Sequence, residues 1–72
     1  MNTPHNIPTT AADILRIAVR QGENLAEWCE CYGDDGDVIY RRAQQALQLG
    51  YWQIDAYGDA SLTSLGERLL AA

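Results

Sequence analysis

The sequence predicts one small domain at residues 9–72, mainly α-helical with a single β-hairpin and a short closing helix, after a tail at residues 1–8. Three segments repeat apolar residues at the spacing of amphipathic helices, a fourth is rich in the residues of strands, and glycines separate them. At 72 residues the chain has room for one core, and a chain of this size buries only about 60% of its unfolded surface. We therefore expect a single domain of modest stability.

The first two helices are predicted from their start and stop signals. Thr10 and Asp13 have the spacing at which each side chain can satisfy a free amide of the first turn, and Gly22 ends the apolar stripe that follows. The second helix is expected to start near Asn24 and to end at Gly33, where a left-handed backbone suits glycine. Its predicted inward face follows the i, i+3, i+4, i+7 pattern and consists of Leu25, Trp28, Cys29 and Tyr32.

The third helix is predicted from about Asp35 to Leu49, with Gly50 as its end. Small residues on its inward face allow a neighbouring helix to approach closely. The predicted inward residues are Ile39, Ala43, Ala46 and Leu49, with Leu47 beside them.

After Gly50 the pattern changes to that of a β-hairpin. Residues 51–56 are rich in aromatic and branched side chains, Tyr57-Gly58-Asp59 supplies a turn, and residues 60–62 return as a second strand. Thr63 is expected to cap a last helix, in which Leu65 and Leu69 lie one turn apart.

This order of elements resembles the winged helix-turn-helix superfamily, of the small bacterial or phage regulator type, over residues 25–70. In such proteins the second helix ends at a glycine, as at Gly33, and a branched apolar residue six places later anchors the recognition helix, as Ile39 would. A leucine-glycine pair precedes the first strand, as in Leu49-Gly50. The stretch from Leu62 to Leu70 is similar to the L-T-x-x-G-x-x-L pattern with which many such wings end. The resemblance implies a winged helix fold, with the third helix against DNA and the hairpin as the wing.

The sequence departs from this family where DNA would be contacted. The position after Gly33 is usually apolar, and the front of the recognition helix is usually Ser, Thr, Arg, Lys or Gln; here the stretch reads Asp34-Asp35-Gly36-Asp37. Carboxylates there oppose phosphates and neutralise the positive helix end, although they can also cap the helix. The wing tip is also negatively charged, because Asp55 and Asp59 lie on either side of Tyr57. The resemblance implies that the exposed side of the third helix offers Asp35, Gly36, Asp37, Tyr40, Arg41 and Gln44.

The charge balance bears on the kind of partner. The net charge is −5, from ten acidic residues and five arginines, without lysine. A DNA duplex or a membrane surface repels a chain with this net negative charge, unless the arginines gather on one face. The adjacent pair Arg41 and Arg42 has two interpretations, a solvated helix flank that pairs with Asp37 or Asp34, or a pair that contacts a partner.

Two hypotheses follow. In the first, the chain is a small acidic regulatory module that acts by protein–protein interaction, in the manner of a phage inhibitor or decoy of a basic, nucleic-acid-handling protein. Its candidate contact residues are Asp34, Asp35, Asp37, Tyr40, Arg41, Gln44, Trp52 and Tyr57. In the second, the chain is a transcriptional regulator that binds DNA as a homodimer. The candidate DNA-binding residues are then Tyr40, Arg41, Arg42 and Gln44, because Arg and Gln can read guanine and adenine.

The aromatic residues divide into two groups. Trp28, Tyr32 and Tyr51 are expected in the core, whereas Trp52 and Tyr57 are expected to be exposed, by strand alternation and by position at the wing tip. Exposed aromatic residues of this kind often anchor protein interfaces.

The cysteine and histidine content gives no sign of a metal or catalytic site. Cys29 and Cys31 are two residues apart on a predicted helix and therefore point to different faces, Cys29 as a buried residue and Cys31 as an exposed one. The single histidine, His5, lies in the tail, and the ligand spacing of a zinc site is absent. We expect no enzyme activity, no metal and no cofactor.

The same residues indicate a compartment. Two free thiols suit a reducing environment, and the sequence contains neither a membrane-length apolar run nor a secretion leader. We expect a cytoplasmic protein without membrane association.

Overall fold

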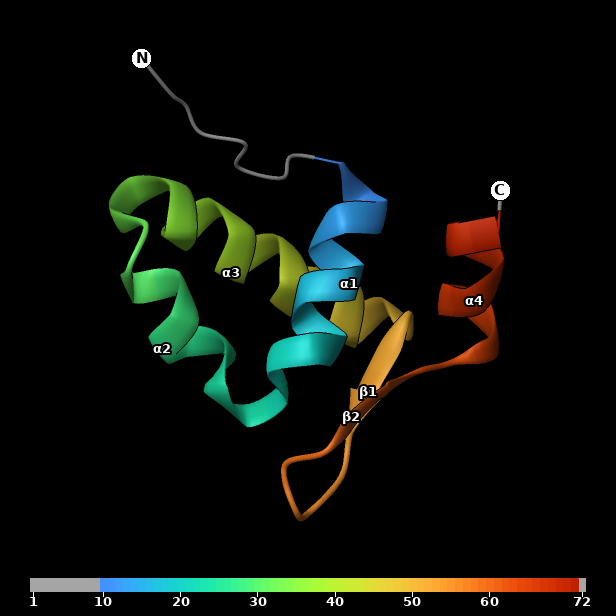
Figure 1. Ribbon diagram of the computed structural model, residues 1–72. Helices are drawn as coiled ribbons and strands as arrows, with labels where there is room; N and C mark the ends of the chain where they lie inside the picture. The colour runs from blue at the N-terminus through green and yellow to red at the C-terminus, as the bar shows by residue number, and fades with distance from the viewer. Residues whose placement is uncertain (1–9, 72) are drawn as a thin grey trace.

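The computed structural model describes residues 10–71 and confirms a mainly helical chain with one small antiparallel hairpin (Figure 1). The predicted tail at residues 1–8 lies outside the described residues. The elements in chain order are α1 (Ala11–Gln21), the 3-10 turn η1 (Gly22–Asn24), α2 (Leu25–Glu30), α3 (Gly33–Leu49), β1 (Trp52–Ile54), β2 (Ala60–Leu62) and α4 (Ser64–Ala71).

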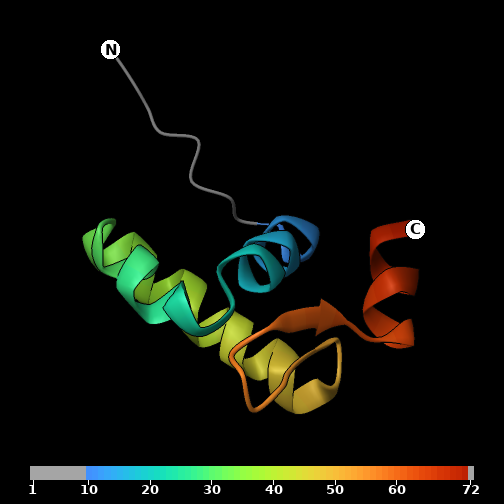
Figure 2. The same ribbon diagram turned by 60° about the horizontal axis from the view of Figure 1, so that its bottom comes forward.

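The molecule has two ends, which are separated by helix α1. α2 and the start of α3 lie at one end, α4 lies at the other, and α1 runs between them (Figures 1 and 2). No helix within residues 10–71 has the length and apolar character that a membrane span requires.

The start of α1 confirms Thr10 as the N-cap, while Asp13 contacts the Thr10 hydroxyl and not, as predicted, a free amide. The Thr10 hydroxyl oxygen accepts a hydrogen bond from the Asp13 amide at 3.1 Å, and the same hydroxyl donates to the Asp13 carboxylate at 2.7 Å. Asp13 also pairs with Arg16 at 3.2 Å. As predicted, α1 ends at Gly22, which has a φ of 53°.

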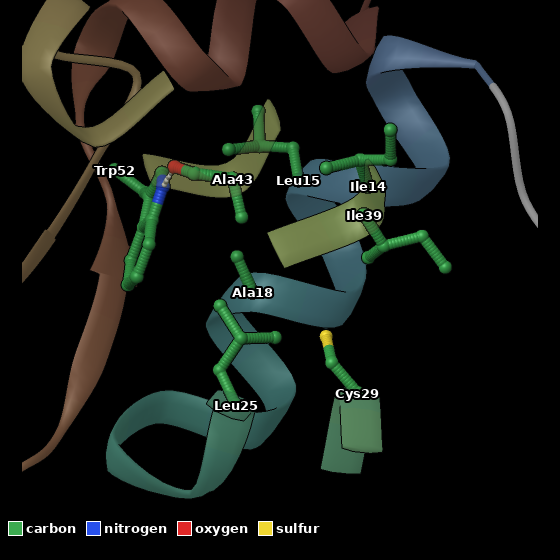
Figure 3. Packing of buried hydrophobic residues seen from close by; sticks show 8 residues of the cluster. All are labelled: Ile14, Leu15, Ala18, Leu25, Cys29, Ile39, Ala43 and Trp52. Carbon is green, nitrogen blue, oxygen red and sulfur yellow. Dashed lines mark hydrogen bonds between the residues drawn. The ribbon is translucent and has the colours of Figure 1, made fainter. Parts of the chain in front are cut away.

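The core is built where α1, α2, α3 and β1 meet (Figure 3). Every helix of the first half contributes apolar residues at helical spacing, and the hairpin contributes one large ring. The buried residues are Ile14, Leu15, Ala18, Leu25, Cys29, Ile39, Ala43 and Trp52.

The second helix begins where predicted, with Asn24 as its N-cap after the 3-10 turn η1, but it ends at Glu30, earlier than predicted. The prediction that Tyr32 faces the core is wrong, since its side chain is 43% exposed. Tyr32 comes after the last residue of α2 and no longer follows the periodicity of that helix. Its ring instead lies against Trp28, itself only half-buried, with the ring centroids 4.6 Å apart.

The third helix begins two residues earlier than predicted, at Gly33, and ends as predicted at Gly50, which is left-handed with a φ of 89°. The prediction that Leu49 faces the core is wrong, because Leu49 is 68% exposed. At about 100° per residue, Leu47 follows Ala43 on the inward side, whereas Leu49 points roughly 120° away from Ala43.

The hairpin and the last helix follow the sequence signals closely. Trp52 pairs with Leu62 and Ile54 with Ala60, so β2 has the predicted bounds, while β1 covers only the middle of residues 51–56. The Thr63 hydroxyl oxygen accepts a hydrogen bond from the Gly66 amide at 3.2 Å and donates to the Gly50 carbonyl. Thr63 therefore caps α4, as predicted, and ties it to the end of α3.

Candidate interaction surface

Most of the negative charge lies in one continuous part of the chain. Eight of the ten acidic residues fall between η1 and the hairpin turn, and the side chains of all eight are exposed. Within residues 10–71, none of these eight forms an ion pair. They are Glu23, Glu27, Glu30, Asp34, Asp35, Asp37, Asp55 and Asp59, and we call them the acidic surface.

The aspartates at the start of α3 are exposed but do not cap the helix. The N-cap residue is Tyr32, and no side chain within the described residues bonds a first-turn amide of α3, so the predicted capping role of Asp34, Asp35 and Asp37 is wrong. The cause is the early helix start, which places Asp34 and Asp35 inside the first turn rather than before it. There they interact favourably with the positive helix end, an effect of about 0.3–1 kcal/mol per charge.

Gly36 fixes how α3 meets α2. The prediction that Gly36 is offered to a partner is wrong, because this residue is buried. A Cβ atom at this position would lie 1.8 Å from the Cys29 carbonyl oxygen. Only glycine therefore permits the close approach of the two helices, and this contact holds the aspartates on both sides of Gly36 in place.

The candidate residues in the middle of α3 separate onto two sides. Asp37, Tyr40, Arg41 and Gln44 follow the three- and four-residue spacing of one helix face. Asp37, Tyr40 and Arg41 are exposed there, whereas Gln44 is half-buried. Arg42 is about 100° further around the helix, and it lines a groove on the side of α1. The structure therefore does not bring Arg41 and Arg42 together as one basic pair.

The prediction that Trp52 is an exposed contact residue is wrong. Its side chain is only 3% exposed, and its indole N–H donates to the Ala43 carbonyl at 2.8 Å (Figure 3). Strand alternation was expected to expose it, but β1 begins at Trp52 with the ring turned into the core, while Tyr51 is only half-buried. Trp52 is a core residue and cannot anchor a partner.

The hairpin turn presents Tyr57 on an ordered loop. Tyr57 is 87% exposed, as predicted. An Asp55 carboxylate oxygen accepts hydrogen bonds from the amides of Tyr57 and Asp59, at 2.8 and 3.0 Å. The Glu23 amide donates to the Gly58 carbonyl at 3.3 Å, so the turn is also attached to η1. The acidic residues of the turn and of η1 therefore adjoin each other.

The two cysteines lie as predicted, Cys29 buried and Cys31 exposed, and both are free thiols. Burial raises the pKa of the Cys29 thiol, and the nearby Asp37 carboxylate raises it further. Within residues 10–71, no group of three His, Cys, Asp or Glu side chains could hold a metal ion.

A second surface, which the sequence did not indicate, lies between α1, the end of α3 and α4. It is an open, mainly apolar groove of about 320 Å³. We call it the α1–α4 groove. Its lining residues are Ala11, Ile14, Leu15, Arg42, Gln45, Ala46, Leu49, Tyr51 and Leu69.

Comparison with known proteins assigns neither surface a function. No protein-family model, curated protein or solved structure matches the chain.

Proposed function

We propose that the chain is a small winged helix domain that acts as a regulator by binding a protein partner through its acidic surface. The element order supports the winged helix assignment, with α3 as the recognition helix and the β1–β2 hairpin as the wing. The observation that carries the functional proposal is the exposure of all eight carboxylates on η1, α2, the first half of α3 and the hairpin turn.

The same charges argue against DNA as the partner. DNA affinity arises mainly from lysine and arginine residues that displace counterions from phosphates. Arg41 is the basic residue on the exposed face of α3 that also carries Asp37, and Asp34 and Asp35 precede it at the helix start. A polyanion on this face would meet more negative charge than positive charge.

A basic protein surface fits better. The carboxylates provide electrostatic complementarity, which speeds association and selects the partner. Tyr57 adds a large, exposed aromatic contact on a hydrogen-bonded turn, so little conformational entropy is lost when it is buried. We therefore expect a partner with a basic site, such as the nucleic-acid-binding site of another protein, for which the carboxylates would take the place of phosphates.

One observation favours the alternative, a dimeric DNA-binding regulator. Tyr40, Arg41 and Gln44 share one face of α3, and Tyr40 and Arg41 are exposed on it. Two copies would present this set twice, which is the reason that dimerisation strengthens DNA binding. Arg42 does not join this set, because it lines the α1–α4 groove.

The proposal is tested by capture of the partner with matched charge variants. We expect the immobilised protein to retain a basic protein from a lysate of its source cells, and Asp37→Lys to lose most of this binding. Glu67→Lys makes the same charge change at an exposed site on α4, outside the acidic surface, and should retain it. Equal loss in both variants, or binding in neither the wild type nor Glu67→Lys, would refute the proposal.

A further inference from the structure

A small hollow lies between η1, the start of α2, the middle of α3 and β1, among the residues of the acidic surface. Its volume is about 150 Å³, whereas a site for a small molecule usually occupies about 300–1,000 Å³. A hollow of this size suits a single side chain of a partner. We call it the η1–α3 hollow, and its lining residues are Gly22, Glu23, Leu25, Ala26, Tyr40, Gln44, Leu47, Trp52 and Ile54.

Most of the lining is apolar, and its deepest part is fixed. Leu25 and Trp52 belong to the buried core, and the hydrogen bond from the Trp52 indole to the Ala43 carbonyl holds the ring in place. Ala26 is exposed, and its small side chain leaves the hollow open. An apolar lining of this kind can cover the methylene stem of a long basic side chain.

Three polar side chains of the lining have acceptor atoms to offer. Within residues 10–71, the side chains of Glu23, Tyr40 and Gln44 form no hydrogen bond and no ion pair. The Glu23 carboxylate is placed by the hairpin turn, since a Cβ atom at Gly58 would overlap it, and the Glu23 amide donates to the Gly58 carbonyl. The lining therefore combines apolar contact with a carboxylate, an aromatic ring and an amide.

The charge around the hollow favours a cation. Glu23 is its charged lining residue. Five carboxylates belong to the lining, lie one helical turn from a lining residue, or lie in the hairpin turn attached to η1, and they are Glu23, Glu27, Asp37, Asp55 and Asp59. Two arginines are nearby, Arg41 next to Tyr40 and Arg20, which lines a neighbouring hollow together with Glu23. The carboxylates outnumber the arginines, so the local potential is negative.

We propose that the η1–α3 hollow receives one arginine side chain of the basic partner, an inference that rests on the proposed function and names the group recognised. The guanidinium group can donate to the Glu23 carboxylate and to the Gln44 side-chain carbonyl, while its stem lies on the apolar lining. Arginine suits this lining better than lysine, because its planar group has five donors, is more weakly hydrated and stacks on aromatic rings such as that of Tyr40.

An NMR titration of the full chain with N-acetyl-arginine N-methylamide tests the inference. This probe copies a single residue and requires no knowledge of the partner. We expect saturable shifts of the backbone amides that line the hollow, with a dissociation constant in the millimolar range, as for a ligand of this size. The citrulline analogue has nearly the same shape without the charge and should give no saturable shift. The lysine analogue should bind several times more weakly.

Two variants locate the binding. Ala26→Leu fills the hollow without changing charge or helix propensity, and it should weaken probe binding about tenfold or more. Ala11→Leu makes the same change at an exposed helical site outside the hollow and should bind as the wild type does. Glu23→Gln should also weaken binding, whereas Glu67→Gln, on α4, should not. A dispersed amide spectrum confirms the fold of each variant.

Several results would overturn the inference. These are shifts spread evenly over the acidic surface, equal binding of the citrulline or lysine analogue, and unchanged binding in folded Ala26→Leu. Capture of the basic partner by Ala26→Leu as strongly as by the wild type would also overturn it, and would leave the proposed function intact. A wild type that captures no basic protein would overturn both, so the two failures are distinguishable.

Discussion

The two ends of this small molecule differ in how their surfaces are made. At the end formed by α2 and the start of α3, all of the charged side chains are exposed and acidic. At the end formed by α4, with the last turn of α3 and α1, charges of both signs surround an apolar groove. The first end suits electrostatic recognition of a basic partner, and the second suits association through apolar contact. One domain can therefore present two separate surfaces of different chemistry.

A glycine brings backbones close together at each end, and the two glycines offer a direct comparison. A Cβ at Gly36 would lie 1.8 Å from the Cys29 carbonyl oxygen, and a Cβ at Gly66 would lie 1.9 Å from the Tyr51 carbonyl oxygen. The first contact joins α2 to α3 inside the core, whereas the second joins the terminal helix α4 to the residue before β1. The same local clash should therefore have different consequences.

The largest expected effect is that of Gly36→Ala. It forces apart α2 and α3, which both supply core residues, and should lower the free energy of unfolding by about 3 kcal/mol or more. Gly66→Ala should cost less, roughly 1–2 kcal/mol, because α4 is terminal and can move outward. Urea denaturation followed by circular dichroism measures both. If Gly66→Ala costs as much as Gly36→Ala, the view that α4 is the less essential end is wrong.

A smaller effect is expected in the reactivity of the two thiols. The exposed Cys31 should react with a thiol reagent at pH 8 many times faster than the buried Cys29, as measured with Cys29→Ser and Cys31→Ser separately. Because the pKa of Cys29 is raised in the fold, its contribution to stability is present at neutral pH and is lost as pH rises above the ordinary thiol range near 9.0. Cys29→Ser should remove that part of the alkaline loss of stability. Equal reaction rates would contradict the burial of Cys29.

The elements could be predicted where the signal is local. Thr10 and Thr63 accept hydrogen bonds from amides three residues later, and Gly50 adopts the left-handed conformation that ends α3. Each of these features depends only on neighbouring residues. The exposure of Asp34, Asp35 and Asp37 could be predicted as well, since charged side chains are rarely buried without a partner.

The errors at Trp52 and Gly36 occurred where the outcome depends on packing between distant residues, whereas those at Tyr32 and Leu49 came from the ends and periodicity of the helices. The direction of Trp52 depends on the Ala43 carbonyl across the core, because a strand of three residues is too short to reveal which side faces inward. The burial of Gly36 depends on the Cys29 backbone. The α1–α4 groove depends on where α4 packs, which no motif in the sequence specifies.

The acidic surface should repel nucleic acid, and a titration of labelled duplex DNA measures whether it does. Anisotropy should show no saturable binding at low or at moderate salt, and Arg41→Ala should change nothing. Saturable binding at low salt that weakens steeply as salt is added, and that Arg41→Ala abolishes, would contradict the claim and favour the DNA-binding regulator.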